Sequence, residues 1–102
     1  MKIIKKLSEM IEEELEDAEK YARKALECKV ERNDLAQVFH ELSTQELRHV
    51  DMLHGEVVKL IEAHRREKGE PPPVMLGIYE YVHGRMIDHA TRVRVMLESF
   101  RK

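Results

Sequence analysis

The stretch LSTQELRHVDML, residues 42–53, lies in the middle of a long segment whose apolar residues recur at helical spacing. Leu42 and Leu53 continue a stripe that begins at Leu35, but the two stripe positions between them hold Glu46 and His49. A carboxylate removed from water without a partner costs several kcal/mol. The stretch therefore predicts a helix with a polar interruption that needs a cation or a hydrogen-bonding partner.

Three helical segments are expected to account for nearly all of the 102 residues, in one domain. Apolar residues recur every three or four positions over about residues 3–28, 35–67 and 74–100. The segment ERND, residues 31–34, separates the first two, and Asp34 with Gln37 predicts a capping box there. Gly69 and the prolines at 71–73 predict a connector over residues 69–73 after a hairpin over about residues 3–68.

The first two segments predict an antiparallel hairpin roughly 38–50 Å long, at about 1.5 Å per residue. The first stripe is interrupted at Glu14, which lies as far before the expected turn as Glu46 and His49 lie after it. The three side chains can therefore meet at one level. Since two helices cannot bury a broad stripe on both sides, the third helix is expected to cover one side. A second copy of the chain is expected to cover the other.

Two carboxylates and an imidazole at one level predict a metal site. Residues i and i+3 share a helix face, so Glu46 and His49 can bind one ion. Oxygen ligands with one imidazole suit Fe, Mn or Zn. The alternatives are that Glu14 pairs with a neighbouring arginine and that His49 is simply hydrogen-bonded.

The segments IEEELEDAEKY, residues 11–21, and ELSTQELRHVDML, residues 41–53, resemble the ferritin-like superfamily. The resemblance is greatest to its half-length group, the encapsulated ferritins. It implies an all-α hairpin that dimerises into a four-helix bundle, with Glu14, Glu46 and His49 as metal ligands and catalytic residues. Two iron ions per dimer would be oxidised from Fe(II) to Fe(III), for ferroxidase activity, iron storage or detoxification.

The same resemblance places Glu13 and Glu16 near a path by which metal reaches the site. It also makes a protein shell a possible partner, although the final LESFRK shows no obvious docking tail.

A second Glu-x-x-His pair, Glu80 and His83, lies beside the stripe of the third segment. It could complete a site within one chain, form an accessory site, or pair with arginine or water. Tyr21 is either a core residue or a redox-active neighbour of the metal. Of the other histidines, His89 is predicted to be a core or interface residue, and the flank or surface is predicted for His40, His54 and His64.

The composition excludes several classes of function. The formal net charge is −2 with basic and acidic residues interspersed, which argues against nucleic-acid and membrane binding. One cysteine, Cys28, and no signal-like run predict a soluble cytoplasmic protein. The alternative function is a metal-free helical module for assembly or protein interaction. In such a module the buried Glu and His would set the register between packed helices.

Overall fold

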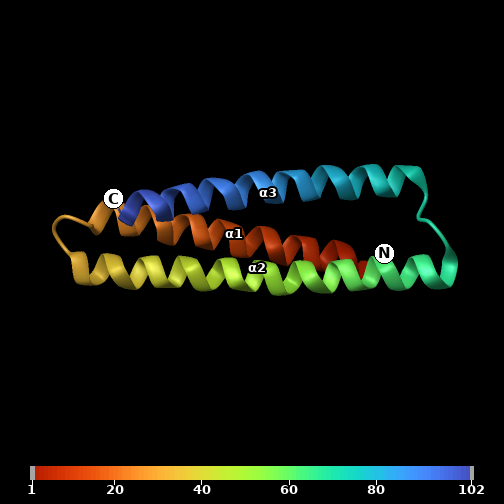
Figure 1. Ribbon diagram of the computed structural model, residues 1–102, viewed down its shortest axis with the longest axis horizontal. Helices are drawn as coiled ribbons and strands as arrows, with labels where there is room; N and C mark the ends of the chain where they lie inside the picture. The colour runs from red at the N-terminus through yellow and green to blue at the C-terminus, as the bar shows by residue number, and fades with distance from the viewer. Residues whose placement is uncertain (1, 102) are drawn as a thin grey trace.

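The computed structural model describes residues 2–101 and consists of three helices, as predicted. They are α1 (Lys2–Cys28), α2 (Asn33–Lys68) and α3 (Pro73–Arg101). Together they form a rod of 56 × 18 × 18 Å, in which α1 and α2 are antiparallel and α3 returns antiparallel to α2 (Figure 1). No strand occurs within residues 2–101. The chain is therefore all-helical, and α1 packs against both of the other helices.

The turn between α1 and α2 does not use the predicted capping box. The second helix begins at Asn33, its N-cap is Arg32, and no side chain caps it. Backbone bonds close the turn instead: the Arg32 N–H donates to the Cys28 carbonyl at 2.8 Å, and the Ala36 N–H donates to the Arg32 carbonyl at 2.9 Å. Asp34 falls inside the first turn, where its negative charge still favours the helix start.

The connector between α2 and α3 depends on one glycine and one proline. Gly69 has a φ of 81°, a left-handed conformation that disfavours other residues, and its N–H donates to the Arg65 carbonyl at 3.1 Å. Pro73 was expected in the connector but is the first residue of α3. A proline is well suited to that position, because the first helical N–H has no partner within the helix.

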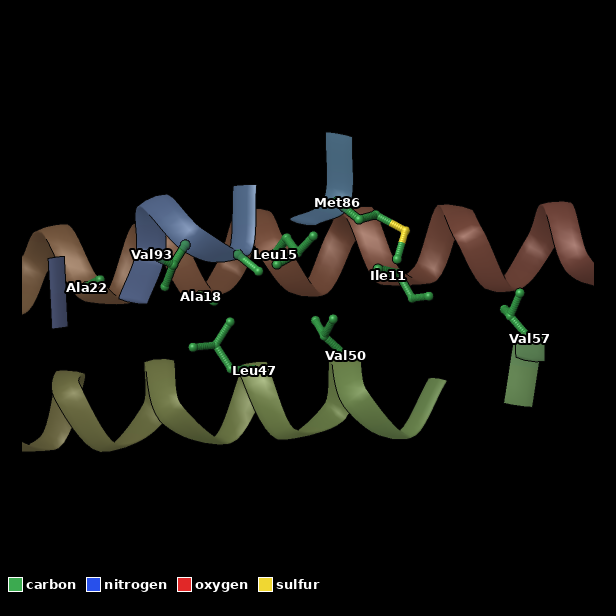
Figure 2. Close-up of a cluster of buried hydrophobic side chains, with 10 residues drawn as sticks. Ile11, Leu15, Ala18, Ala22, Leu47, Val50, Val57, Met86 and Val93 are labelled. Atoms are coloured by element: carbon green, nitrogen blue, oxygen red, sulfur yellow. The ribbon is translucent and has the colours of Figure 1, made fainter. Parts of the chain in front are cut away.

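The core forms where α1 faces both other helices (Figure 2). Alanines on α1 leave room for α2 to approach closely, and at this point the buried Ser43 hydroxyl donates to the Ala18 carbonyl at 2.7 Å. A smaller cluster, Ala25, Ala36 and Phe100, closes the end near the first turn. The main cluster consists of Ile11, Leu15, Ala18, Ala22, Leu47, Val50, Val57, Met86, Ala90 and Val93.

The predicted stripes coincide only partly with this core. Ile11, Ala18 and Ala25 are buried as expected, but Glu14 and Tyr21 are only partly buried. On α2 the predicted stripe residue Val57 is buried as expected, whereas the other buried positions, Ala36, Ser43, Leu47 and Val50, are each adjacent in sequence to a predicted stripe position. The predicted stripe of α2 consequently lies on the flank of the core rather than in its centre.

The backbones of α2 and α3 approach each other at few positions, and side-chain rings bridge the space between these two helices. His40 packs on Phe100 and His54 packs on His83, each with ring centroids 4.8 Å apart. Histidine is long enough to make contact where an alanine could not. Within residues 2–101, the helices all carry too much charge or too few apolar residues to cross a membrane.

Candidate metal centre

Glu14 of α1 and Glu46 and His49 of α2 come together as predicted. The antiparallel hairpin sets their common level, and the i, i+3 spacing puts Glu46 and His49 on one side of α2. One ligand atom from each side chain lies within 4.8 Å of the other two. Elsewhere in residues 2–101, no other three histidine, cysteine or acidic residues gather this closely.

The distances within the cluster fit a metal ion after a small adjustment. The Nδ1 atom of His49 lies 3.3 Å from Oε2 of Glu14 and 3.8 Å from Oε1 of Glu46. Metal–ligand bonds of about 2.1 Å place neighbouring ligand atoms about 3–4 Å apart. Without an ion, the protonated Nδ1 can donate to Glu14 instead, so the same geometry also makes an ordinary hydrogen bond.

The cluster is open to solvent, contrary to the expectation of a buried site. The side chains of Glu14, Glu46 and His49 are 28%, 19% and 51% exposed. Its cost in desolvation is accordingly lower than that of a core carboxylate. An exposed imidazole also leaves room for a metal ion and for further ligands.

The cluster faces away from α3. An α-helix turns by about 100° per residue, so His49 points roughly 180° away from His40 and roughly 140° away from His54. Both of those histidines contact α3. On α1, Glu14 is likewise turned roughly 140° from Glu19, which contacts His89 of α3. The third helix therefore covers the opposite side of the hairpin.

Apolar side chains surround the cluster on the same side of the hairpin, at helical spacing from the three ligands. Met52 is 70% exposed and Val38 54% exposed, although both are large and apolar. Tyr21 and Phe39 stack here with ring centroids 6.2 Å apart. We call this side the open face; its other large apolar residues are Ile3, Met10, Leu35 and Leu42, and Leu7 and Leu53 lie at its edge, where they also pack against the main core cluster.

The less central candidates lie elsewhere. Glu13 is exposed, and Glu16 lines a cavity of about 300 Å³ that α1 shares with α3. Glu80 and His83 belong to α3 and do not join the cluster, because His83 packs on His54 instead. They therefore do not complete the site within one chain.

Glu19 forms an ion-pair network between α1 and α3 that sequence reasoning missed. Its carboxylate lies 3.0 Å from Nε2 of His89 and 3.1 Å from the Arg23 guanidinium. Partial burial raises the pKa of Glu19, but Arg23 and His89 together hold that pKa below its ordinary value. The prediction for His89 as an interface histidine is confirmed. Only the long-range pairing of α1 with α3 could have identified Glu19 as its partner.

His40, His54 and His64 of α2 are half-buried, which agrees with the predicted flank position and not with an exposed surface position. Each has one ring nitrogen that is buried and without a hydrogen-bond partner in residues 2–101. Burial, and to a lesser extent the neighbouring His83, lower the pKa of His54, while Asp51 raises it. The interval of fourteen residues between His40 and His54 was the available signal, since it returns to the same helix face.

Comparisons with known proteins place no constraint on these assignments. The chain matches no family model, and neither curated proteins nor solved structures include one with detectable similarity to it.

Proposed function

We propose that two copies of this chain pair through their open faces and hold two iron ions, which dioxygen or peroxide oxidises there from Fe(II) to Fe(III). The observation that carries the proposal is the convergence of Glu14, Glu46 and His49 from two helices within 4.8 Å. Such a protein would be a ferritin-like, di-iron oxidoreductase acting in ferroxidation, iron storage or detoxification. Mn or Zn would be substitutes for Fe.

One chain supplies an incomplete coordination sphere. Iron in oxygen-rich sites takes more than three ligands, so a single cluster leaves positions for water, oxidant or a second set of ligands. Because the cluster is on an exposed side of the hairpin, a second copy can reach it. A ferritin-like bundle has this arrangement, with carboxylates and histidines from four helices projecting into its centre.

Charge also favours a shared pair of ions. Each chain contributes two carboxylates to the cluster, so two chains contribute 2 × 2 = 4 negative charges. Two Fe(II) ions carry four positive charges and neutralise them. Neutral His49 then acts as a ligand through Nδ1, the nitrogen that already faces both carboxylates.

The apolar residues of the open face supply the association energy. Burial contributes roughly 25 cal/mol per Å² of apolar surface. Met52, Val38 and Met10 leave such surface in water in the single chain. Contiguous apolar surface of this kind marks interaction sites in soluble proteins.

The experiment is anaerobic titration with Fe(II), followed by admission of air while the near-UV ferric absorbance is recorded. We expect about one iron per chain, with rapid oxidation, in a dimer or larger oligomer measured by light scattering. Glu46→Gln and His49→Gln should lose most of both binding and oxidation. Glu41→Gln is the matched control, because Glu41 is an exposed carboxylate on α2 that accepts a hydrogen bond from Gln45 and does not belong to the cluster.

Other results would assign a different role. Two irons per chain would contradict the shared site and require additional ligands within the monomer. Absence of binding would contradict the enzyme assignment and favour the metal-free assembly module, in which the bond from His49 to Glu14 sets the register of α1 and α2. In that case Glu14→Ala would change association alone.

A further inference from the structure

The first half of α3 is linked to α2 by a stack of aromatic rings. The His54 and His83 rings lie 4.8 Å apart between centroids, with planes 5° from parallel. Tyr79, one turn before His83 on α3, is also parallel to that ring at 5.8 Å. Because the backbones of α2 and α3 approach each other at few positions, their link here depends on side chains: this stack, and the apolar residues of both helices that pack on the main core cluster.

The stack suits neutral rings and not charged ones. The Nε2 atom of His54 is buried and has no hydrogen-bond partner within residues 2–101. A protonated imidazole donates from both nitrogens, so it would leave a buried N–H without an acceptor. Two imidazolium rings in parallel contact would also repel each other.

No carboxylate among the described residues lies within ion-pair distance of either ring. His49 and His89 each have a glutamate within ion-pair distance, whereas His54 and His83 have none among the described residues. The nearest acidic influence on His54 comes from Asp51, and it is smaller than the effects of burial and of His83.

Within residues 2–101, the charged groups that line the two neighbouring cavities form no ion pair with His54 or His83. A cavity of about 500 Å³ adjoins the stack at Tyr79, and a second cavity, lined in part by Met86, lies between α1 and α3. The charged groups around the first cavity are Lys5 of α1, Glu62 and Arg65 of α2, and Glu80 of α3. Those around the second are Glu12 and Glu16 of α1, and Arg85, Asp88, His89 and Arg92 of α3.

We propose that the His54–His83 stack is an acid-sensitive latch, which holds the first half of α3 against α2 while both rings are neutral and releases it when they are protonated. Release exposes the apolar walls of the 500 Å³ cavity, including Ile61 and Val82. The latch is independent of metal binding, since it lies on the side of α2 that faces α3.

The direction of the pH dependence follows from the lowered pKa of His54. The open form binds more protons than the closed form. Closure is therefore fully stabilised above the ordinary histidine pKa of about 6.5, and weakens as the pH falls from there toward the lowered value. Acidification, not alkalinisation, opens the latch.

The test measures the separation of α2 and α3 in the full chain with chelator present. Two probes at the exposed positions Lys59→Cys and Tyr81→Cys, in a Cys28→Ser background, report this distance. We expect the distance distribution to lengthen as the pH falls below about 6.5, with a severalfold rise in fluorescence of a dye that binds apolar surface. Helical content should stay constant, because α3 moves as a helix.

Two variants separate the latch from general acid unfolding. His54→Phe with His83→Phe keeps two stacked rings that cannot take a proton, and should stay closed at pH 5. His40→Phe is the matched control, because His40 also has a buried, unpartnered Nε2 but packs on Phe100 at the far end of the bundle. It should open as the unmodified chain does.

Two outcomes would overturn the proposal. One is an unmodified chain that remains closed at pH 5, and the other is a double variant that opens with an unchanged midpoint. If the double variant does not fold, the ring titration of His54 by NMR in the unmodified chain decides instead. A midpoint clearly below 6.5, shared with the opening transition, supports the latch, and an ordinary midpoint contradicts it.

Discussion

The two sides of the α1–α2 hairpin have similar amounts of apolar sequence and opposite structural roles. On the side that α3 covers, Leu15, Leu47 and Val93 are buried in a continuous core. On the open face, half-buried and exposed apolar residues surround Glu14, Glu46 and His49. The difference shows that this chain keeps its paired carboxylates away from its completed core, on a surface where water, an ion or a second chain can reach them.

The largest expected effect is on the covered side. Leu15→Ala removes a side chain that is 1% exposed and packed within the main cluster, so it should lower the free energy of unfolding by about 2–5 kcal/mol. Met52→Ala on the open face should change the stability of the monomer by less than about 0.5 kcal/mol. Urea unfolding of both variants, at a concentration where the chain is monomeric, measures the contrast. Equal losses would contradict the division into two faces.

A charge on the open face should break association without unfolding the chain. Met52→Glu places a carboxylate on a residue that is 70% exposed in the single chain, so the helices should form normally. In a paired complex the same carboxylate would be desolvated, and the dissociation constant should rise by at least about tenfold. Analytical ultracentrifugation gives the constant. Lys59→Glu, on the exposed surface of the same helix, is the control.

The close approach of α1 and α2 can be tested at Ser43. Ser43→Ala removes the 2.7 Å hydrogen bond to the Ala18 carbonyl and should cost about 1 kcal/mol, a value typical of such bonds. Ser43→Val should cost more, because the site is fully buried and additional volume forces the helices apart. The free energy of unfolding in urea distinguishes the two. If Ser43→Val stabilised the chain instead, α1 and α2 would be packed less closely at Ser43 than the structure shows.

The smallest effect concerns Glu19 and its dependence on pH. Folding lowers the pKa of Glu19, so the ionised carboxylate contributes to the free energy of unfolding. This contribution is fully present above the ordinary glutamate pKa of about 4.3, and it is lost as the pH falls through the lowered pKa. His89→Gln removes one of the groups that lower it, and should cost up to about 1 kcal/mol at pH 6. Urea unfolding measures this loss of stability, which should become smaller as the pH is lowered toward 3. A pH-independent loss would attribute it to packing alone.

The three helices could be predicted because their apolar residues follow a 3.6-residue period and because glycine and proline mark their ends. The centre of the buried face could be predicted only in part. Glu14 and Leu15 point about 100° apart on α1, and both belong to series with large apolar members. The buried face of α1 shares Ile11 and Ala18 with the predicted stripe, but it also includes Leu15 and Ala22. Alanine is small enough to allow close packing, and for the same reason it gives a weak signal in a sequence.

The cluster of Glu14, Glu46 and His49 was predictable because it depends on one turn and on helical spacing alone. The pairings of His54 with His83 and of Glu19 with His89 were not. They depend on the rotation and height of α3, which follow from the connector after Gly69 and from packing along the whole of α1. Contacts between distant segments of this kind leave no local pattern.

The position of the cluster within the first two helices has a consequence for how the protein is made. The residues of α1 and α2 that contact each other lie on either side of one short turn. The residues of α3 that contact α1 are much farther from it in the sequence. Local contacts form fastest, and chains fold from the N-terminus during synthesis. Glu14, Glu46 and His49 are therefore all in place once residue 68 has emerged from the ribosome. The nascent hairpin can therefore bring these three side chains together before α3, which covers its other side, has left the ribosome.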